Sequence, residues 1–381
     1  MATYLEEAVL APLRSTLGSA EARVDKVYAD YAELTDDEPL AKWSATEEQP
    51  SRQDALDFLQ AFGTAATAEA KKDTGLQALR SQALQDIGDF VTKVQGDQCP
   101  AFPHIHPHRL AIELALRARR PRVVNQRSTV LCGAAAILSA AFKTDPGRTV
   151  RFVLDLVRLG KGTLRGYTLE PYGCVKDEPP PTRFEMAQVD WVMLASLRYH
   201  FEPLAALVGM TLGQGAADPL RQLTKPGLLY STLQNMGYTT VADRTFGRET
   251  FSRNAQVASA VTRAWMHGQT ETSRGEANLQ LAIDDLRKGR LIFLWGYGEL
   301  TTRSPVRDPQ GTPYPDIHGK PVKKNDSIGF PELHWTLVRK LAIHGDKVQL
   351  RHYSWGDARE ASFPKAAFFD VYQGHVMADP A

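Results

Sequence analysis

Cysteine is scarce in this sequence, and its pattern excludes several kinds of site. Cys99, Cys132 and Cys174 are the only cysteines among 381 residues, and no two of them form a CxxC pair. An odd number of widely spaced cysteines excludes a disulfide framework and the zinc clusters that paired cysteines build. We therefore expect reduced thiols.

Long hydrophobic runs are also missing. No apolar stretch reaches the roughly 18 residues that a membrane-spanning helix needs, so we expect no membrane partner. The first residues, Met-Ala-Thr-Tyr-Leu-Glu-Glu, lack the basic and then apolar stretches of a secretory signal. We expect a protein that is cytoplasmic, or one that is secreted without a cleaved signal peptide.

Neither sign of charge is in surplus. The chain has 45 Lys and Arg against 44 Asp and Glu, and its formal net charge is +1. This balance excludes a general basic field for binding nucleic acid. The hydrophobic share of 43% is too high for a disordered chain. The sequence predicts a folded protein of about two domains that binds no nucleic acid.

Residues 1–120 have the periodicity of amphipathic helices. Apolar residues recur at helical spacing within residues 5–17, 56–62 and 79–91. This pattern predicts a helical N-terminal region. Such helices commonly pack as a scaffold, and the alternative is a module that docks a partner.

Three alternating histidines follow in a stretch that prolines interrupt. His104, His106 and His108 would share one face of an extended segment, and imidazoles are ligands that suit zinc. Their spacing matches no standard zinc site, and the prolines favour a polar loop. We therefore expect no metal and no cofactor.

After residue 121 the pattern changes from helices alone to helices and strands. Residues 132–142 predict a helix that begins at Cys132. Further helices are predicted at 148–159, 184–198, 226–236, 249–264 and 279–289. Three strands are predicted at 290–297, 334–343 and 347–355, and the closing segment 364–372 as a helix or a strand. A turn near Gly345 joins the last two strands in a hairpin. The predicted fold class is α+β.

Two residues are the first candidates for chemistry. The thiol of Cys132 lies at a helix N-terminus, where the helix dipole favours the reactive thiolate. His334 opens a strand, and an imidazole at the mouth of a sheet can act as general base toward a cysteine on a facing helix. Each has a plainer interpretation. Cys132 would be a small buried apolar residue, and His334 a strand-end histidine bonded to the backbone.

The strand that follows supplies a third candidate group. An antiparallel hairpin returns the end of its second strand to the start of its first. Residues 353–357 are therefore expected beside His334, where Tyr353 or Asp357 would orient the imidazole. The plainer interpretation is a hairpin end with an aromatic core anchor.

Together these features resemble the papain-like cysteine peptidases. In that superfamily a glutamine stands six positions before the nucleophilic cysteine, as Gln126 stands before Cys132. The catalytic histidine opens a strand, as His334 does, and Ser-Trp-Gly follows in a later strand, as at 354–356. The run Cys-Gly-Ala-Ala at 132–135 is similar to the helix start of the bacteriocin-processing branch.

The resemblance implies a papain-like domain over residues 121–381. Insertions near 160–183 and 301–331 would account for the long interval between Cys132 and His334. Two features depart from papain itself: the residues around the cysteine differ, and the position before Ser-Trp-Gly is not asparagine.

The same resemblance implies a role for each site residue. Cys132 would be the nucleophile and His334 the base. The side-chain amide of Gln126 would donate to the oxyanion together with the backbone N–H of Cys132. The imidazole would be oriented by Tyr353, which the alignment favours, or by Asp357, whose carboxylate is the better acceptor.

These roles imply hydrolysis of an amide bond in a protein or peptide substrate through an acyl-enzyme. The composition suggests a bacterial effector or toxin, whose partners would be an inhibitor or immunity protein or a secretion chaperone. The alternatives are a deamidase, transglutaminase or acyltransferase that uses the same thiol, and a non-catalytic interaction protein in which Cys132 is unreactive.

Overall fold

The structure is a computed structural model, and it describes residues 49–69, 74–126, 131–177, 179, 186–201, 224, 226–245, 272–297, 333–354 and 357–380. The chain divides into two compact units. The helical unit comprises residues 1–129, 138–214 and 355–357, and the sheet unit comprises residues 130–137, 215–354 and 358–381. The sequence predicts a division at 120/121, whereas residues 138–214 group with the N-terminal helices.

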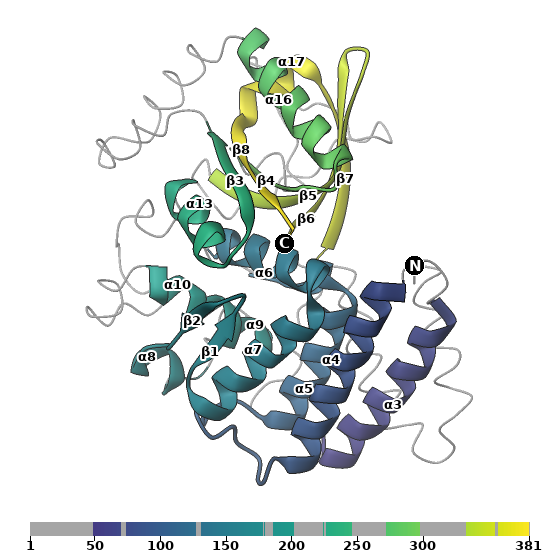
Figure 1. The fold of residues 1–381 in the computed structure, drawn as a ribbon, viewed down its shortest axis with the longest axis vertical. Helices are drawn as coiled ribbons and strands as arrows, with labels where there is room; N and C mark the ends of the chain where they lie inside the picture. The colour runs from purple at the N-terminus through teal and green to yellow at the C-terminus, as the bar shows by residue number, and fades with distance from the viewer. Residues whose placement is uncertain are drawn as a thin grey trace. The chain divides into compact units, whose positions relative to one another are not determined.

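The helical unit is built around α5 (Pro107–Arg119), whose residues are all buried. Three longer helices pack beside it: α3 (Arg52–Glu69), α4 (Thr74–Lys93) and α7 (Pro146–Leu159) (Figure 1). A proline at the first position begins both α5 and α7, where its missing N–H costs nothing. The helices predicted within 56–62, 79–91 and 148–159 are confirmed.

The rest of the helical unit consists of shorter elements. These are η4 (Pro121–Val123), most of α6 (Cys132–Thr144), the hairpin of β1 (Gly162–Leu164) and β2 (Tyr167–Leu169), α8 (Gly173–Lys176), α9 (Gln188–Asp190), η6 (Trp191–Ala195) and α10 (Ser196–Phe201). The β1–β2 hairpin and α8 lie in the region expected to be an insertion. The helix predicted at 184–198 corresponds to α9, η6 and α10.

A buried ion pair joins α5 to α9. The Nε and Nη2 atoms of Arg117 donate to the two carboxylate oxygens of Asp190 at 2.7 and 2.6 Å, and both side chains are buried. Burial raises the pKa of Asp190, and the charge of Arg117 opposes that rise. Glu113 extends the network by accepting from Arg109 Nε and from the N–H of Val189, each at 3.0 Å. Buried charges need such partners, so the network fixes these helices in one arrangement.

The sheet unit contains a six-stranded sheet in the order β3-β8-β4-β5-β6-β7. Its strands are β3 (Thr239–Thr245), β4 (Leu291–Tyr297), β5 (Leu333–His344), β6 (Lys347–Ser354), β7 (Asp357–Pro364) and β8 (Tyr372–Asp379). The β3–β8, β8–β4, β4–β5 and β5–β6 pairs are antiparallel. An antiparallel sheet separate from a helical unit makes the fold α+β, as predicted.

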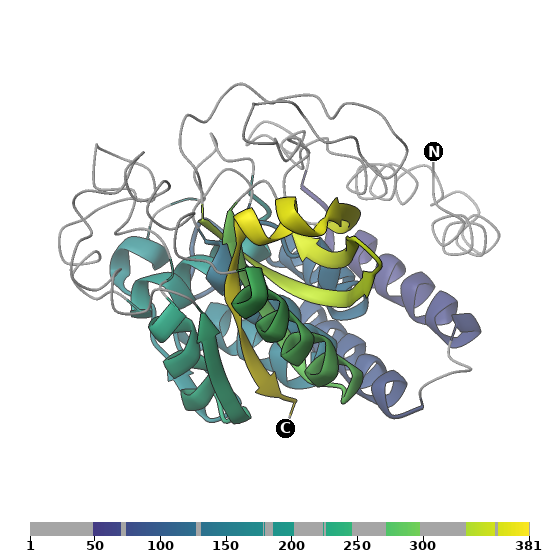
Figure 2. The same ribbon diagram turned by 90° about the horizontal axis from the view of Figure 1, so that it is seen from above.

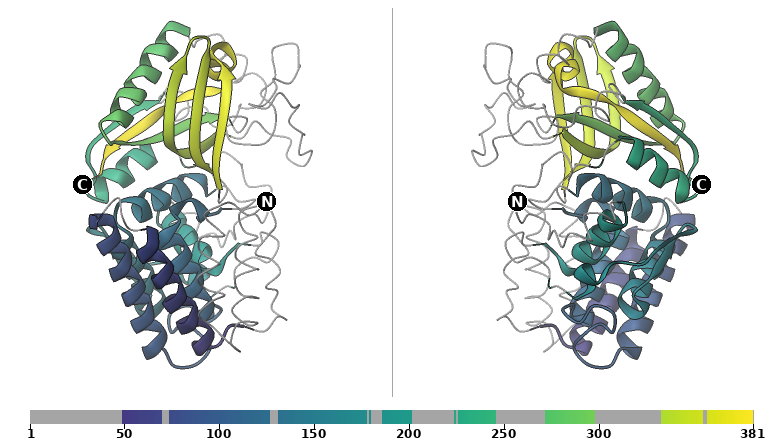
Figure 3. Two further views of the ribbon diagram at one scale, coloured as in Figure 1. Left: turned by 90° about the vertical axis from the view of Figure 1, so that its right-hand side faces the viewer. Right: turned by 90° about the vertical axis from the view of Figure 1, so that its left-hand side faces the viewer.

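Three helices accompany the sheet: α13 (Pro226–Asn235), α16 (Thr272–Arg287) and α17 (Lys365–Val371). Helix α16 lies along one face and contacts β4, β5 and β8 (Figures 2 and 3). Its buried side chains include Leu279, Ala282 and Ile283, one turn apart along the helix. These three side chains form an apolar part of the core between α16 and the sheet.

The predictions for the sheet unit are largely confirmed where the structure describes it. The predicted strands correspond to β4, β5 and β6, and Gly345 forms the hairpin turn with a φ of 60°. The closing segment is the helix α17 followed by a strand, β8. The predictions for 5–17, 249–264 and 301–331 fall outside the described residues. No helix in the described ranges is long and apolar enough to cross a membrane.

Candidate active site

The first turn of α6 and the start of β5 meet at Thr224, a buried residue of the sheet unit. A Cβ atom on Gly133 would lie 2.4 Å from both Cβ and Oγ1 of Thr224, so only glycine fits there. On its other side, the backbone oxygen of Thr224 accepts a hydrogen bond from Trp335 Nε1 at 2.6 Å. We call these three residues the Thr224 junction. It ties the residue after Cys132 to the residue after His334.

Cys132 is the first residue of α6 and takes part in no disulfide. The carbonyl of Leu131 accepts the first helical bond, from the N–H of Ala135 at 2.8 Å. The N–H groups of Cys132, Gly133 and Ala134 therefore lie ahead of the helical ladder, at the positive end of the helix dipole. The dipole favours a thiolate here. The burial of Cys132, which is 3% exposed, opposes it.

His334 is the second residue of β5 and pairs with Gly296 of β4. Its side chain is buried at 5% exposure. The neighbouring Trp335 pairs with Trp295, and their rings lie 4.5 Å apart. Because side chains alternate along a strand, Trp335 faces Thr224 while His334 takes the opposite face, which also carries Thr336. His334 is therefore next in the chain to Trp335, which contacts Thr224, but its own side chain lies on the other face of the sheet.

Tyr353, a candidate for orienting the imidazole, lies on the other face of the sheet from His334. It pairs with Leu337 of β5, three residues beyond His334, and cross-strand partners share a face. The guanidinium of Arg339 lies 5.1 Å from the centre of its ring. The backbone oxygen of Tyr353 accepts from Thr336 Oγ1. This register separates the phenol of Tyr353 from His334, because a three-residue offset along a strand changes the face.

The other two predicted site residues group with the helical unit. Asp357 is the first residue of β7, and its side chain lies outside the described part of the structure. Gln126 is buried at 4% exposure. It follows Asn125, whose backbone N–H donates to Asp190 at 3.1 Å, so the network around Arg117 also fixes the backbone before Gln126.

Sequence reasoning missed several polar residues of this structure. Thr224 carries no motif, and its position becomes clear only from its contacts with Gly133 and Trp335. His375, fully buried in β8, was also missed; its Nδ1 is 2.7 Å from the Tyr372 hydroxyl. Burial, followed by the charge of Arg244, lowers the pKa of His375 to about 3. A neutral imidazole is therefore part of the core of the sheet.

No family model, curated protein or solved structure matches the chain. The papain-like assignment depends on the residues of this sequence alone.

Proposed function

We propose that the chain is a thiol hydrolase in which Cys132 and His334 form the reacting pair. The observation that carries the proposal is the Thr224 junction, which joins the residue after Cys132 to the residue after His334 within one unit. A nucleophile and its base must be held near each other by rigid elements. The Thr224 junction supports the proposal because it holds the helix start after Cys132 and the strand start after His334 against one buried residue.

In the proposed reaction, Cys132 gives its proton to His334 and its sulfur attacks the carbonyl carbon of an amide. His334 returns the proton to the departing amine, which leaves a thioester on Cys132. A water molecule then gives a proton to His334 and adds to the thioester carbonyl. The carboxylic acid leaves, and the sulfur of Cys132 takes the proton back. The reaction consumes only the amide and water.

The position of Cys132 in α6 supports its role as the nucleophile. The unbonded N–H groups of the first turn of α6 point toward the helix N-terminus, where Cys132 lies, and they favour a negatively charged sulfur there. The glycine that follows lets the helix start approach Thr224 more closely than any other residue allows. The Cys-Gly pair therefore has a physical reason in this fold beyond its similarity to a motif.

The test is the pH profile of alkylation of Cys132 by iodoacetamide, followed by peptide mass spectrometry. We expect half-maximal reactivity well below the value of ~8.5 for a free thiol. His334→Ala should move the profile back toward that value. His352→Gln is the matched control, because it replaces another buried histidine one strand away, in β6. A wild-type profile near ~8.5 contradicts the proposal.

A non-catalytic interaction protein is the second candidate function, and one observation favours it. Because side chains alternate along β5, Trp335 points toward Thr224 and His334 points away from it. Cys132 is also almost fully buried. On that account the Thr224 junction is a packing contact and Cys132 a small apolar residue. A Cys132 thiol that reacts only when the protein unfolds supports this candidate.

Hydrolysis is distinguished from transfer or deamidation by product analysis. A peptidase yields two chains with a new amino terminus, whereas a deamidase converts glutamine to glutamate and leaves the chain intact. A transglutaminase or acyltransferase joins the acyl group to an added amine instead of water. Mass spectrometry of peptide libraries incubated with and without an amine acceptor separates the three outcomes.

A further inference from the structure

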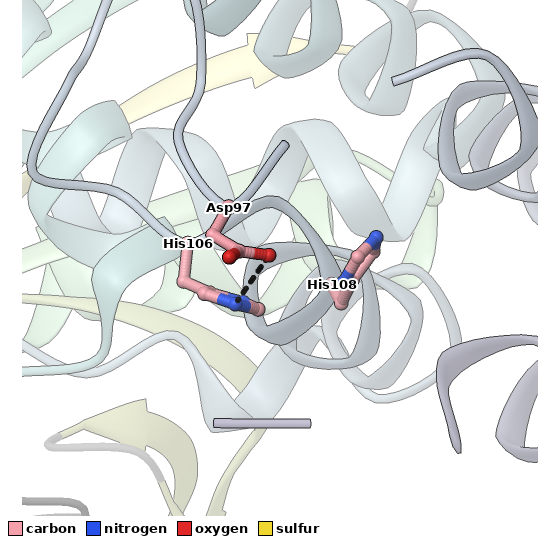
Figure 4. A group of neighbouring side chains, drawn as sticks. All are labelled: Asp97, His106 and His108. Carbon is pink, nitrogen blue, oxygen red and sulfur yellow. Dashed lines mark ion pairs between the residues drawn. The ribbon is translucent and has the colours of Figure 1, made fainter. Parts of the chain in front are cut away.

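A second group of reactive side chains lies at the start of α5 in the helical unit. Asp97 follows α4, His106 is the N-cap of α5, and His108 lies in the first turn of α5 (Figure 4). One ligand atom from each residue lies within 4.8 Å of those of the other two. His106 Nε2 is 3.9 Å from Asp97 Oδ1, and the rings of His106 and His108 are 5.3 Å apart. The three side chains surround one small volume.

This group differs from the one that the sequence suggested. An extended segment would have put His104, His106 and His108 on one face. Instead Pro107 begins α5, so His106 and His108 come together through the helix cap. His104 is exposed in the preceding turn, outside the group. The third member of the group is Asp97, which no sequence pattern indicates.

His108 is the member that most needs a partner. It is 6% exposed, and neither of its ring nitrogens makes a hydrogen bond of good geometry. Burial lowers the pKa of His108, and the charge of Arg52 adds to that effect. The nearby carbonyl of Pro50 and the carboxylates of Asp97 and Asp54 act in the opposite direction. A buried ring nitrogen without a well-formed hydrogen bond destabilises the fold. A ligand beside His108 would remove that cost.

The placement of the three side chains suits a metal ion. The cap and first turn of α5 hold His106 and His108, and their ring nitrogens lie near the carboxylate of Asp97. Asp97 is 86% exposed, so its carboxylate can rotate toward the rings at little cost. The group offers two imidazole nitrogens and one carboxylate oxygen, which are ligands of transition metal ions.

Neighbouring groups define the limits of this ligand set. Cys99 lies in the same loop but is fully buried, and burial raises the pKa of its thiol to about 12. Its sulfur is not among the ligand atoms that lie within 4.8 Å of one another. The cation nearest in sequence, Arg109, is paired with Glu113 at 3.0 Å, which offsets its repulsion of a metal ion.

We propose that Asp97, His106 and His108 bind a divalent transition metal ion of the zinc class. Two imidazoles and a carboxylate are a ligand set of such ions, and three protein ligands leave a position for water. Ligand distances of about 2 Å require the donor atoms to approach to about 3.3 Å from one another. The exposed side chain of Asp97 can move toward the rings, and the two imidazoles must also rotate toward each other. The bound ion would fasten the loop that joins α4 to α5.

Binding has one identifiable cost. His106 Nδ1 accepts the N–H of Arg109 at 3.4 Å as the cap of α5. Coordination through Nε2 places the ring proton on Nδ1 and breaks that bond. At 3.4 Å the bond is long and therefore weak. The interactions gained by His108 and by the metal outweigh its loss.

The test is a titration of the full chain with Zn²⁺ by calorimetry, with a competing chelator to exclude weak surface binding. We expect one equivalent to bind in the wild type and to raise the unfolding temperature, because the ion binds the folded state. Asp97→Asn should weaken binding by roughly tenfold or more. This change is at an exposed side chain and leaves the packing intact. His108→Asn is the second variant.

His104→Ala is the matched control, because it removes an exposed histidine of the same loop. It should bind Zn²⁺ like the wild type. Visible absorption after substitution with Co²⁺ reports whether imidazole and carboxylate ligands surround the ion. Absence of a bound equivalent in the wild type overturns the proposal, as does binding that His104→Ala abolishes and Asp97→Asn leaves unchanged.

Discussion

Replacing Gly133 by alanine tests the Thr224 junction most sharply. The added Cβ would lie 2.4 Å from Cβ and Oγ1 of Thr224 and 2.5 Å from its Cγ2. These three atoms include the base of the side chain, so no rotation of Thr224 relieves the overlap. The backbone of Thr224 is itself held by Trp335 through the 2.6 Å hydrogen bond. The backbone of α6 or of Thr224 must therefore move to accommodate the alanine.

The magnitude follows from two opposing effects. Overpacking a buried contact costs about 1–3 kcal/mol. Alanine in place of glycine in a helix is otherwise favourable by up to about 1 kcal/mol. Gly227 provides the comparison, because it is the second residue of α13, as Gly133 is of α6, and a Cβ there would meet nothing within 4 Å. We expect Gly133→Ala to lower the free energy of unfolding and Gly227→Ala to leave it unchanged or raise it.

Urea denaturation followed by tryptophan fluorescence measures the difference, since Trp295 and Trp335 lie in the sheet unit. A second substitution sharpens the test. Thr224→Gly removes all three clashing atoms. Adding Gly133→Ala to Thr224→Gly should therefore cause no further loss of stability, although Gly133→Ala destabilises the wild type. Thr224→Ala keeps the Cβ atom at 2.4 Å, so Gly133→Ala should still lower stability in that background. Equal stability of Gly133→Ala and Gly227→Ala would refute the reasoning.

Three further predictions concern the cores of the two units. Arg117→Met leaves Asp190 buried without its cation and should lower the unfolding free energy by about 3–5 kcal/mol, measured by urea denaturation. His375 has a folded pKa of about 3 against 6.5 for the free group, so its contribution is complete above pH 6.5 and is lost as pH falls toward 3. Between pH 6.5 and 4.5 that loss is about 2–3 kcal/mol, and His375→Gln should remove this part of the pH dependence. Gly374→Ala should destabilise the β3–β8 pair, because its φ is 102° and a Cβ would lie 2.5 Å from the carbonyl oxygen of Arg244; an unchanged melting temperature would contradict this.

The sequence was informative wherever local patterns decide structure. The β5–β6 hairpin follows from two apolar runs around Gly345, and α6 follows from its alanine-rich helical pattern. The strand β8 was harder, because all but its last residue are buried. A strand buried on both faces shows no alternation, so its pattern does not distinguish it from a helix.

The sites depend on contacts between distant residues, which sequence patterns do not report. Thr224 and Trp335 are 111 residues apart, and no periodicity links them. Gly133 belongs to the Cys-Gly-Ala-Ala motif, but no sequence pattern identifies Thr224 as the residue that approaches it. Asp97 was missed because its meeting with His106 depends on how the loop folds back onto the helix cap. Tyr353 was placed near His334 by counting along the hairpin, but the register puts it on the opposite face.

We propose that Cys132 is an activated nucleophile with His334 as its base. Intact-mass analysis after exposure to an epoxysuccinyl inhibitor of papain-type enzymes tests it directly, with the wild type compared with Cys132→Ala and His334→Ala. We expect a single adduct on Cys132 in the folded wild type and none in either variant. Labelling distributed over Cys99 and Cys174, or no labelling of the folded protein, would contradict it.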